Sequence, residues 1–171
     1  MSSVRQILRI VGLCFFRQTS QFEQAAVPRG FIVHSESVAQ ERDLIPALER
    51  LLARSDVLIA IPDSVVHNRS TVQPLLMTTY RAGVPVIGFS ESYSLAGAVA
   101  SLHSSPDQIG RQVAEVVSGA LKGRFSPGIL GPRYFRVTTN STVARSLGIT
   151  VPGGAVLEER IEAVEREAPA P

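Results

Sequence analysis

Cysteine is almost absent from this chain of 171 residues, in which Cys14 is the only example. A single cysteine excludes an internal disulfide, and it does not indicate an oxidising or a reducing compartment. Lysine is equally scarce: Lys122 is the only one, so arginine carries nearly all of the positive charge. The 17 basic and 15 acidic residues leave a net charge of +2. Because the arginines lie singly, without the clusters of a nucleic-acid-binding surface, we predict no nucleic-acid partner.

Long apolar runs are also missing. The longest run near the amino terminus extends from Ile10 to Phe16, far short of the roughly 20 residues that cross a bilayer as a helix. Arg5 and Arg9 precede this run as basic residues precede the core of a signal peptide, but no convincing small-residue cleavage site follows. Leu13 also stands where a lipoprotein signal needs a small residue before its cysteine. We therefore expect no export signal in this sequence.

The overall composition is that of a folded globular protein, since 44% of the residues are hydrophobic and 19% are charged. The length suits one full hydrophobic core and not two ordinary domains. We predict a single α/β domain over residues 1–150. A charged carboxy-terminal tail, partly helical or disordered, is predicted over residues 151–171.

A strand, a helix and a second strand are predicted between Asp56 and Tyr93, and they form the centre of the fold. The first is Val57–Ile61, a short apolar run without alternation, which is typical of a strand buried on both faces of a parallel sheet. The polar segment HNRS and a helix over about residues 70–83 follow. The second strand is Val86–Phe89. Because a helix connects them, the two strands are predicted to be parallel neighbours.

Helix starts are indicated by serine with glutamate or glutamine three residues later, the spacing of a capping box. This spacing occurs at Ser20 and Glu23, at Ser70 and Gln73, and at Ser105 and Gln108. Two further predictions are an apolar stripe from Leu44 to Leu52 with Asp43 as N-cap, and one along the helix after Ser105 at Ile109, Val113, Val116, Val117 and Ala120. Tyr80 is expected in the core.

The other predicted elements complete an alternation of strands and helices. Strands are predicted at Arg9–Phe16, Phe31–Val33, Ala98–His103 and Tyr134–Thr138, with helices at Ser20–Val27 and Ser141–Leu147, a turn at Ser92–Ala96 and a final helix from Glu158. Such alternation predicts a doubly wound, mostly parallel α/β sheet.

Two turns at the carboxyl edge of this sheet form the candidate ligand-binding site. Asp63 and Ser64 follow the first central strand, and Ser90 and Glu91 follow the second. Parallel neighbours end at the same edge, where open α/β sheets usually bind ligands. Tyr93 offers an aromatic face for stacking on a ligand. Asp63 fits a turn or helix-cap residue equally well.

Catalytic patterns are incomplete. Ser90 lies in GFSES, which departs from the nucleophile-elbow pattern G-x-S-x-G at its last position. The three histidines and the single cysteine have no short spacing that would make a metal site. Neither a P-loop nor a dinucleotide-binding glycine motif is present. We predict a protein that is not an enzyme, with no catalytic residues, no metal and no cofactor.

Three segments of the chain resemble the ABC-transporter substrate-binding protein family that includes tryptophan- and tyrosine-binding members. They are LLARSDVLIAIPDSVVHN, LLMTTYRAGVPVIGFSESYSLAGAVASLHSSPDQIGRQ and YFRVTTNSTVARSLGI. The resemblance implies the type I periplasmic-binding-protein fold, in which two α/β lobes close on a small solute and deliver it to a membrane permease. It also implies that the turns at Asp63-Ser64 and Ser90-Glu91 face the cleft and bind the amino or carboxylate group of an amino-acid-like solute.

The resemblance covers about one lobe, mainly the carboxy-terminal one. Family members carry a secretion signal and an amino-terminal lobe before this region, and neither is recognisable here. The family implies a periplasmic location, whereas the lack of a recognisable export signal favours the cytoplasm. An exposed cleft face would favour a homodimer. The alternative is a stand-alone receiver-like or flavodoxin-like regulatory or interaction domain, although the lysine that a receiver needs at a later strand end is missing.

Overall fold

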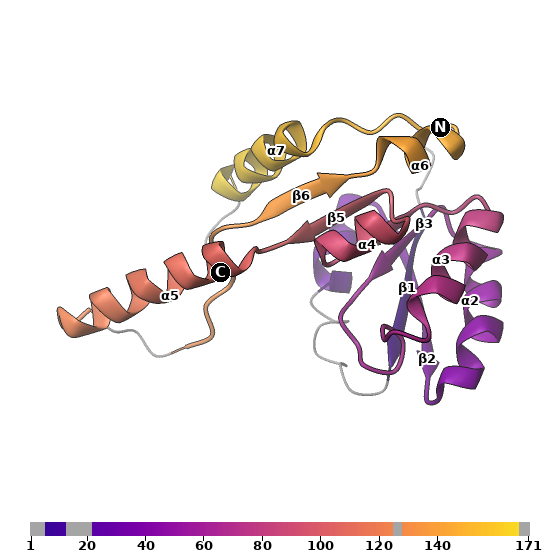
Figure 1. Cartoon of the computed structure of the whole chain (residues 1–171), viewed down its shortest axis with the longest axis horizontal. Helices are drawn as coiled ribbons and strands as arrows, with labels where there is room; N and C mark the ends of the chain where they lie inside the picture. The colour runs from indigo at the N-terminus through magenta and orange to yellow at the C-terminus, as the bar shows by residue number, and fades with distance from the viewer. Residues whose placement is uncertain (1–5, 13–21, 125–127, 168–171) are drawn as a thin grey trace.

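Six strands form one sheet in the order β2-β1-β3-β4-β5-β6, and only β6 is antiparallel to its neighbour (Figure 1). The computed structural model describes residues 6–12, 22–124 and 128–167. The strands are β1 (Gln6–Gly12), β2 (Ile32–Val38), β3 (Val57–Ala60), β4 (Val86–Gly88), β5 (Ala100–His103) and β6 (Arg136–Thr139). The mostly parallel α/β architecture predicted from the sequence is confirmed.

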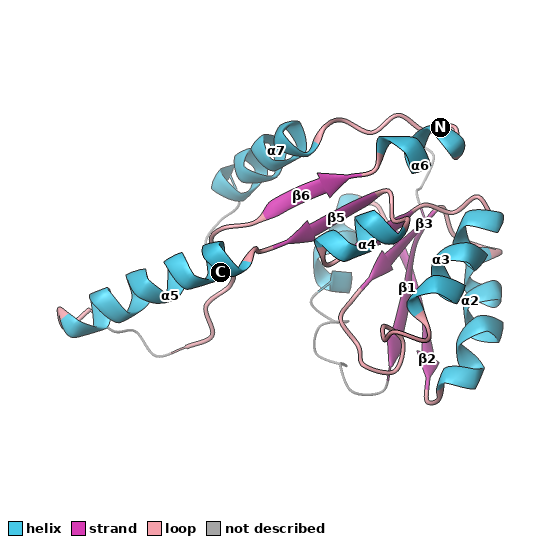
Figure 2. Ribbon diagram, viewed as in Figure 1, coloured by secondary structure: helices cyan, strands magenta, loops and turns pink. Residues whose placement is uncertain are grey.

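Helices connect the strands (Figure 2). The α-helices are α2 (Leu44–Leu52), α3 (Val72–Arg81), α4 (Glu91–Ala96), α5 (Pro106–Leu121), α6 (Ser141–Ser146) and α7 (Gly154–Glu167), and the 3-10 helices are η1 (Val27–Arg29) and η2 (Glu41–Asp43). Residues 22–26 are also helical. Within the described ranges, no helix combines the length and apolar character needed to span a membrane.

The strand order contains one reversal, between β1 and β3. From β1 the chain moves outward to β2 and then returns to the other side of β1 at β3. Because crossovers between parallel strands are right-handed, this reversal places the connecting segments on opposite faces of the sheet. The carboxyl ends of β1 and β3 therefore flank a topological switch point, the usual position of the ligand crevice in open α/β sheets.

The centre of the core is the apolar stripe of α2. Leu44, Leu48 and Leu51 are fully buried where α2 packs on β1, β2 and α3. Leu58 of β3 and Leu75 of α3 meet them from the sheet and the neighbouring helix. Each fully buried leucine contributes about 1.5–3 kcal/mol relative to an exposed one. The predicted stripe is thus confirmed, and it holds the β3–α3–β4 unit in place.

The second strand is longer than predicted. β2 continues from Ile32 through the polar residues to Val38, because it lies at the edge of the sheet and can keep polar side chains on its solvated side. Glu36 forms ion pairs with Arg50 of α2 at 2.9 Å and with Arg54, just after α2, at 3.4 Å. These pairs join the edge strand to the helix above it.

The predicted helix caps had mixed outcomes. The box before α5 is confirmed: the Gln108 backbone N–H donates to Ser105 Oγ at 3.2 Å, and the Ser105 N–H donates to Gln108 Oε1 at 2.9 Å. The box at Ser70 is wrong, because α3 begins at Val72 and Ser70 Oγ donates to Glu41 Oε2 at 2.9 Å instead. Asp43 precedes α2, but its side chain makes no capping bond. Ser20 lies outside the described residues.

Two local predictions near the central strands are also wrong. The segment from Ser92 to Ala96 belongs to the short helix α4 and is not a turn. Tyr80 is exposed. The buried side of α3 consists of Leu75, Leu76 and Thr79, and Tyr80 lies outside it.

After β5 the chain makes an excursion away from the sheet before it returns (Figure 1). α5 projects beyond the end of β5, and the chain returns as β6, which pairs antiparallel with β5. α7 begins at Gly154, before the predicted Glu158, and packs on β6. The Val137 backbone N–H donates to Glu158 Oε1 at 2.7 Å. Gly154 lies so close to the Val137 carbonyl that a Cβ atom would overlap it.

Candidate functional site

The carboxyl ends of β3 and β4 border an open hollow of about 480 Å³. Its walls come from the loop after β3, the first turn of α3, the end of β4 and the outer face of α4. The lining residues are His67, Asn68, Arg69, Val72, Gln73, Phe89, Ser90, Ser92, Tyr93 and Ala96. This is the edge of the sheet at which the sequence predicts a ligand.

Asp63 shapes the loop after β3. Its side chain is only 6% exposed, and Oδ1 accepts hydrogen bonds from the backbone N–H groups of Val65 at 2.8 Å and Val66 at 3.0 Å. The His67 N–H closes the same turn onto the Asp63 carbonyl at 2.9 Å. Asp63 Oδ2 is buried without a hydrogen-bond partner among the described residues. Asp63 therefore acts first as a turn-forming residue and is not one of the lining side chains.

His67 belongs to an aromatic cluster that lines the hollow. Its ring centroid is 5.4 Å from that of Phe89 and 5.6 Å from that of Tyr93, both in edge-to-face geometry. Burial lowers the pKa of His67 from 6.5 to about 4, and the nearby charge of Asp63 opposes this shift. The imidazole is therefore neutral at pH 7.

The His67 ring and the Tyr93 side chain are hydrogen-bonded to each other through Nδ1 and the hydroxyl group. Burial raises the pKa of the Tyr93 hydroxyl, so this group remains protonated at pH 7. His67 Nε2 is buried and has no hydrogen-bond partner in the described parts of the chain. A buried polar atom without a hydrogen bond is costly.

Gly88 allows Tyr93 to approach the sheet this closely. A Cβ atom at Gly88, the last residue of β4, would overlap Tyr93 Cβ and lie 2.8 Å from Ser101 Oγ. The Tyr93 ring can therefore pack over the end of the strand, where its centroid is 4.9 Å from that of Phe89. The ring is almost completely buried, so it supplies the wall of the hollow more than an open stacking surface.

The rim of the hollow is polar. Ser90 Oγ and Ser92 Oγ are 2.8 Å apart at the start of α4. In the loop after β3, Asn68 Nδ2 donates to Glu41 Oε1 at 2.7 Å, which fixes the loop, and Arg69 is exposed. The lining of the hollow therefore combines aromatic rings, hydroxyl groups and a cation.

The structure brings together only part of the predicted site. Ser90 and Tyr93 line the hollow, whereas Asp63, Ser64 and Glu91 do not. Ser64 and Glu91 are exposed next to it. Sequence reasoning missed His67 and Arg69, which lie in the polar segment HNRS after the first central strand. Their position just beyond a strand end was the signal that could have identified them.

No metal centre was found in the structurally described ranges, since no group of three His, Cys, Asp or Glu side chains is placed to hold an ion.

Several solved structures share the fold. A conserved domain protein from Vibrio cholerae is 28% identical with a TM-score of 0.68, and the match covers 91% of this chain and 53% of that one. An ABC domain from Streptococcus pneumoniae in complex with L-Trp is 18% identical with a TM-score of 0.68, covering 91% and 54%. The ligand-free, open form of a substrate-binding protein with adhesive properties from Clostridium difficile is 18% identical with a TM-score of 0.68, covering 86% and 51%.

These matches concern about half of each solved chain, so this chain spans about half of their length. No curated protein matches the sequence. The family model described as ABC transporter substrate binding protein matches residues 16–163. Since this match includes most of the chain, the protein belongs to the ABC transporter substrate-binding protein family.

Proposed function

We propose that the chain binds a small, amino-acid-like solute in the hollow at the carboxyl ends of β3 and β4, as the solute-binding component, or one lobe of it, of an ABC importer. The observation that carries the proposal is that one hollow is lined both by the aromatic side chains Phe89 and Tyr93 and by polar groups of Asn68, Arg69, Ser90 and Ser92. An amino acid with an apolar side chain needs both kinds of surface. The L-Trp bound by the Streptococcus pneumoniae neighbour supports this class of solute.

The charges on the rim suit a zwitterion. Arg69 and the amino-terminal turn of α3 favour the carboxylate of the solute, because a guanidinium and a helix amino terminus both attract anions. Ser90 and Ser92 offer hydroxyl oxygens to the ammonium group, and Glu91 adds a carboxylate beside them. Asp63 contributes by holding the loop and His67, with Ser64 as an outer contact.

The partner in this proposal is an ABC permease, and the place of action is the periplasm or the cell exterior, where the family typically works. No catalytic step is proposed, since the family is a substrate-binding class. The family membership argues against the alternative of a receiver-like or flavodoxin-like regulatory domain.

Affinity is expected to be weak for this chain alone. Binding pockets usually bury most of a small ligand, whereas this hollow is open and contacts the solute from one side. Losing about 4 kcal/mol of contacts weakens binding by roughly three orders of magnitude. We expect dissociation constants in the high-micromolar to millimolar range in calorimetric titrations of the monodisperse protein with the twenty amino acids.

Two variants test the position of the site. Arg69→Ala should weaken binding of the amino acid at least about tenfold, because the exposed cation pairs with the carboxylate. It should have little effect on the corresponding amine, which lacks that group. Arg81→Ala is the matched control, since Arg81 is an exposed arginine at the other end of α3. A submicromolar dissociation constant that survived Arg69→Ala and His67→Phe together would place the site elsewhere.

A further inference from the structure

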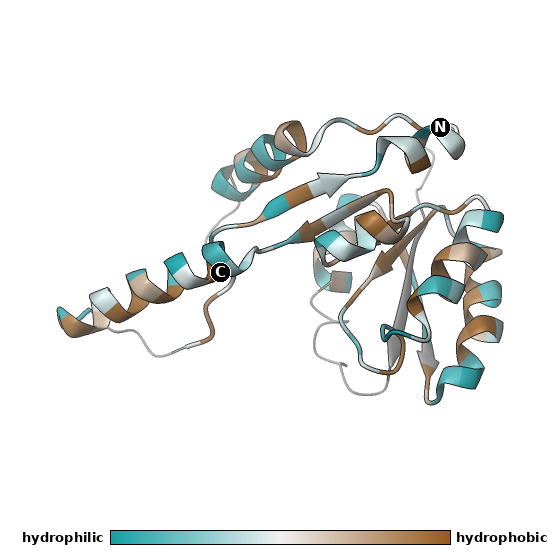
Figure 3. Cartoon of the chain, in the orientation of Figure 1, coloured by the Kyte–Doolittle hydropathy of each residue, from teal (hydrophilic) through white to brown (hydrophobic). Residues whose placement is uncertain are grey.

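One carboxylate holds the loop that presents Arg69 to the hollow. Glu41 lies in η2, between β2 and α2, and its two oxygens bind the residues on either side of Arg69. Asn68 Nδ2 donates to Glu41 Oε1 at 2.7 Å, and Ser70 Oγ donates to Glu41 Oε2 at 2.9 Å. Figure 3 shows this part of the chain as the hydrophilic end of the loop before α3. A side chain from another connecting segment therefore fixes both neighbours of the arginine.

Asn68 completes the arrangement from within the loop. Its Oδ1 accepts hydrogen bonds from the backbone N–H groups of Ser70 at 2.9 Å and Thr71 at 3.2 Å. Its own backbone N–H donates to Thr71 Oγ1 at 2.9 Å. Besides its bond to the carboxylate, Asn68 Nδ2 lies 3.2 Å from the carbonyl oxygens of Ser64 and Val65. The backbone on both sides of the arginine is thus ordered before a solute binds, which lowers the ordering cost of binding.

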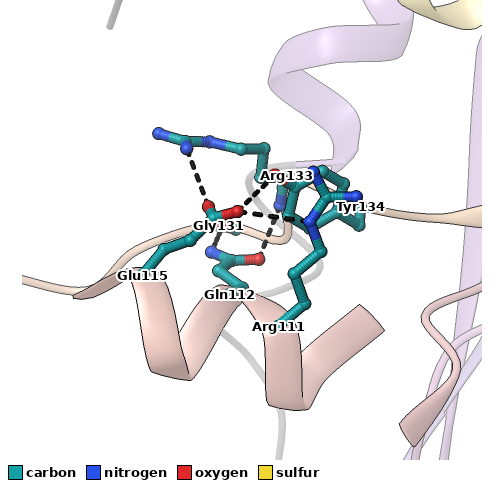
Figure 4. A network of polar contacts seen from close by, with 6 residues as sticks. All are labelled: Arg111, Gln112, Glu115, Gly131, Arg133 and Tyr134. Carbon is teal, nitrogen blue, oxygen red and sulfur yellow. Dashed lines mark hydrogen bonds and ion pairs between the residues drawn. The ribbon is translucent and has the colours of Figure 1, made fainter. Parts of the chain in front are cut away.

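Glu41 holds the loop without occupying the arginine. Arg69 forms no hydrogen bond or ion pair with the residues that the structure describes, although it lies between the two residues bonded to the carboxylate. Elsewhere the chain uses a carboxylate differently, since Glu115 pairs with Arg111 at 3.3 Å and with Arg133 at 3.0 Å (Figure 4). The guanidinium groups of that network are occupied, whereas the guanidinium of Arg69 is available to a solute.

The support for this contact is rigid. Glu41 belongs to η2, which leads directly into α2, and Leu44 at the start of α2 is buried in the core. Side chains that are held by such elements keep a binding group in place more precisely than a loop does alone. Glu41 itself is exposed and does not line the hollow. Its influence on a solute in the hollow therefore passes through the loop.

We propose that Glu41 is a positioning residue for solute binding, which acts through Arg69. It keeps the arginine at the hollow and leaves the guanidinium free for the carboxylate of the solute. A carboxylate that accepted from Arg69 would compete with the solute for the same donors. The neutral donors of Asn68 and Ser70 occupy the Glu41 oxygens instead. The inference rests on the proposed function of the hollow.

NMR chemical-shift titration of the isotope-labelled protein with two probes tests the proposal. L-tryptophan carries the carboxylate, and tryptamine has the same ring and ammonium group without it. We expect Glu41→Ala to weaken binding of L-tryptophan about fivefold to tenfold, because the contact between guanidinium and carboxylate loses its fixed geometry. Tryptamine should bind Glu41→Ala as it binds the parent chain. An equal loss for both probes would overturn the proposal, since it would reflect general damage to the hollow.

A conservative variant and a matched control accompany this measurement. Glu41→Gln keeps an oxygen acceptor for Asn68 Nδ2 and a polar group beside Ser70, so it should retain L-tryptophan binding to within about twofold. A loss as large as that of Glu41→Ala would overturn the role of these hydrogen bonds. Glu115→Ala is the control, because Glu115 also fixes a loop but lies on α5 and does not line the hollow. It should leave the binding of both probes unchanged.

A double-mutant cycle separates this inference from the proposed function. If Glu41 acts through Arg69, then Glu41→Ala should weaken L-tryptophan binding by less than about twofold in an Arg69→Ala background. A further large loss in the double variant would overturn the inference, because Glu41 would then act by another route. So would an effect of Arg69→Ala that Glu41→Ala does not share. If Arg69→Ala alone leaves L-tryptophan binding unchanged, the proposed site itself is wrong, and the inference fails with it.

Discussion

The imidazole of His67 is neutral because its surroundings disfavour the charged form. Burial is the main cause of its low pKa, and Asp63 opposes the shift only in part. The unfolded chain, with a histidine pKa of 6.5, binds a proton more readily than the folded chain does between pH 6.5 and about 4. The contribution of this group to stability is therefore complete above pH 6.5 and is lost as the pH falls to about 4.

We expect the free energy of unfolding to decrease by about 2 kcal/mol across this window. The value of about 1.4 kcal/mol per pKa unit sets an upper limit of roughly 3 kcal/mol, which the partial exposure of the ring reduces. Urea unfolding at a series of pH values measures the slope. His67→Phe should remove it, whereas Tyr93→Phe should keep it, since that variant retains the ring that buries His67. An unchanged slope in His67→Phe would assign the effect to another group.

At the same scale, the sequence predicted the edge of the sheet where the hollow lies better than it predicted the side chains that line it. Parallel neighbouring strands end at the same edge of the sheet, which the sequence pattern alone predicts, and Ser90 and Tyr93 do lie at the hollow there. The role of Asp63 depends on a local turn in which Oδ1 accepts from the Val65 and Val66 backbone N–H groups. No periodicity predicts such a contact. The pKa of His67 likewise depends on burial by residues distant in sequence.

The capping box of α5 has a local effect on stability. Ser105→Ala removes one hydrogen bond to an orphan backbone N–H, which costs about 1 kcal/mol. Since α5 extends away from the core, this loss should appear as fraying of its first turn. We expect amide exchange there to accelerate about fivefold with little change in Tm.

Hydrogen exchange measured peptide by peptide checks this expectation. Ser118→Ala is the matched control, because Ser118 is exposed in the interior of the same helix and alanine is the stronger helix former. It should slow exchange slightly or leave it unchanged. An equal loss of protection throughout the sheet in Ser105→Ala would show that α5 unfolds together with the core.

At the scale of elements, periodicity predicted which segments are helices better than it predicted whether their apolar sides are covered. The stripes of α2 and α5 are equally clear in the sequence, but the stripe of α2 is buried and that of α5 is exposed. A pattern identifies the apolar side of a helix and not what covers it. The length of β2 was underestimated for a related reason, since an edge strand tolerates polar residues that a central strand would exclude.

For the whole molecule, the alternation of strands and helices predicted the parallel part of the sheet. The antiparallel direction of β6 could not be predicted, because it depends on the course of α5. A helix that packs back on the sheet would return the chain to a parallel strand. α5 instead projects outward, so the chain comes back beside β5 in the opposite direction.

Because the chain returns beside β5, cleavage between β5 and β6 should leave two fragments that stay associated. Lys122, the only lysine, is exposed after α5, so a lysine-specific protease has a single site, between β5 and β6. The two pieces would still share the β5–β6 ladder, and Ser94 would still join them: its hydroxyl donates to Thr138 O at 3.2 Å, and Asn140 Nδ2 donates to its carbonyl at 2.8 Å. The cleaved protein should therefore migrate as one species in native size-exclusion chromatography and as two in denaturant, a nicked chain held together by its own sheet.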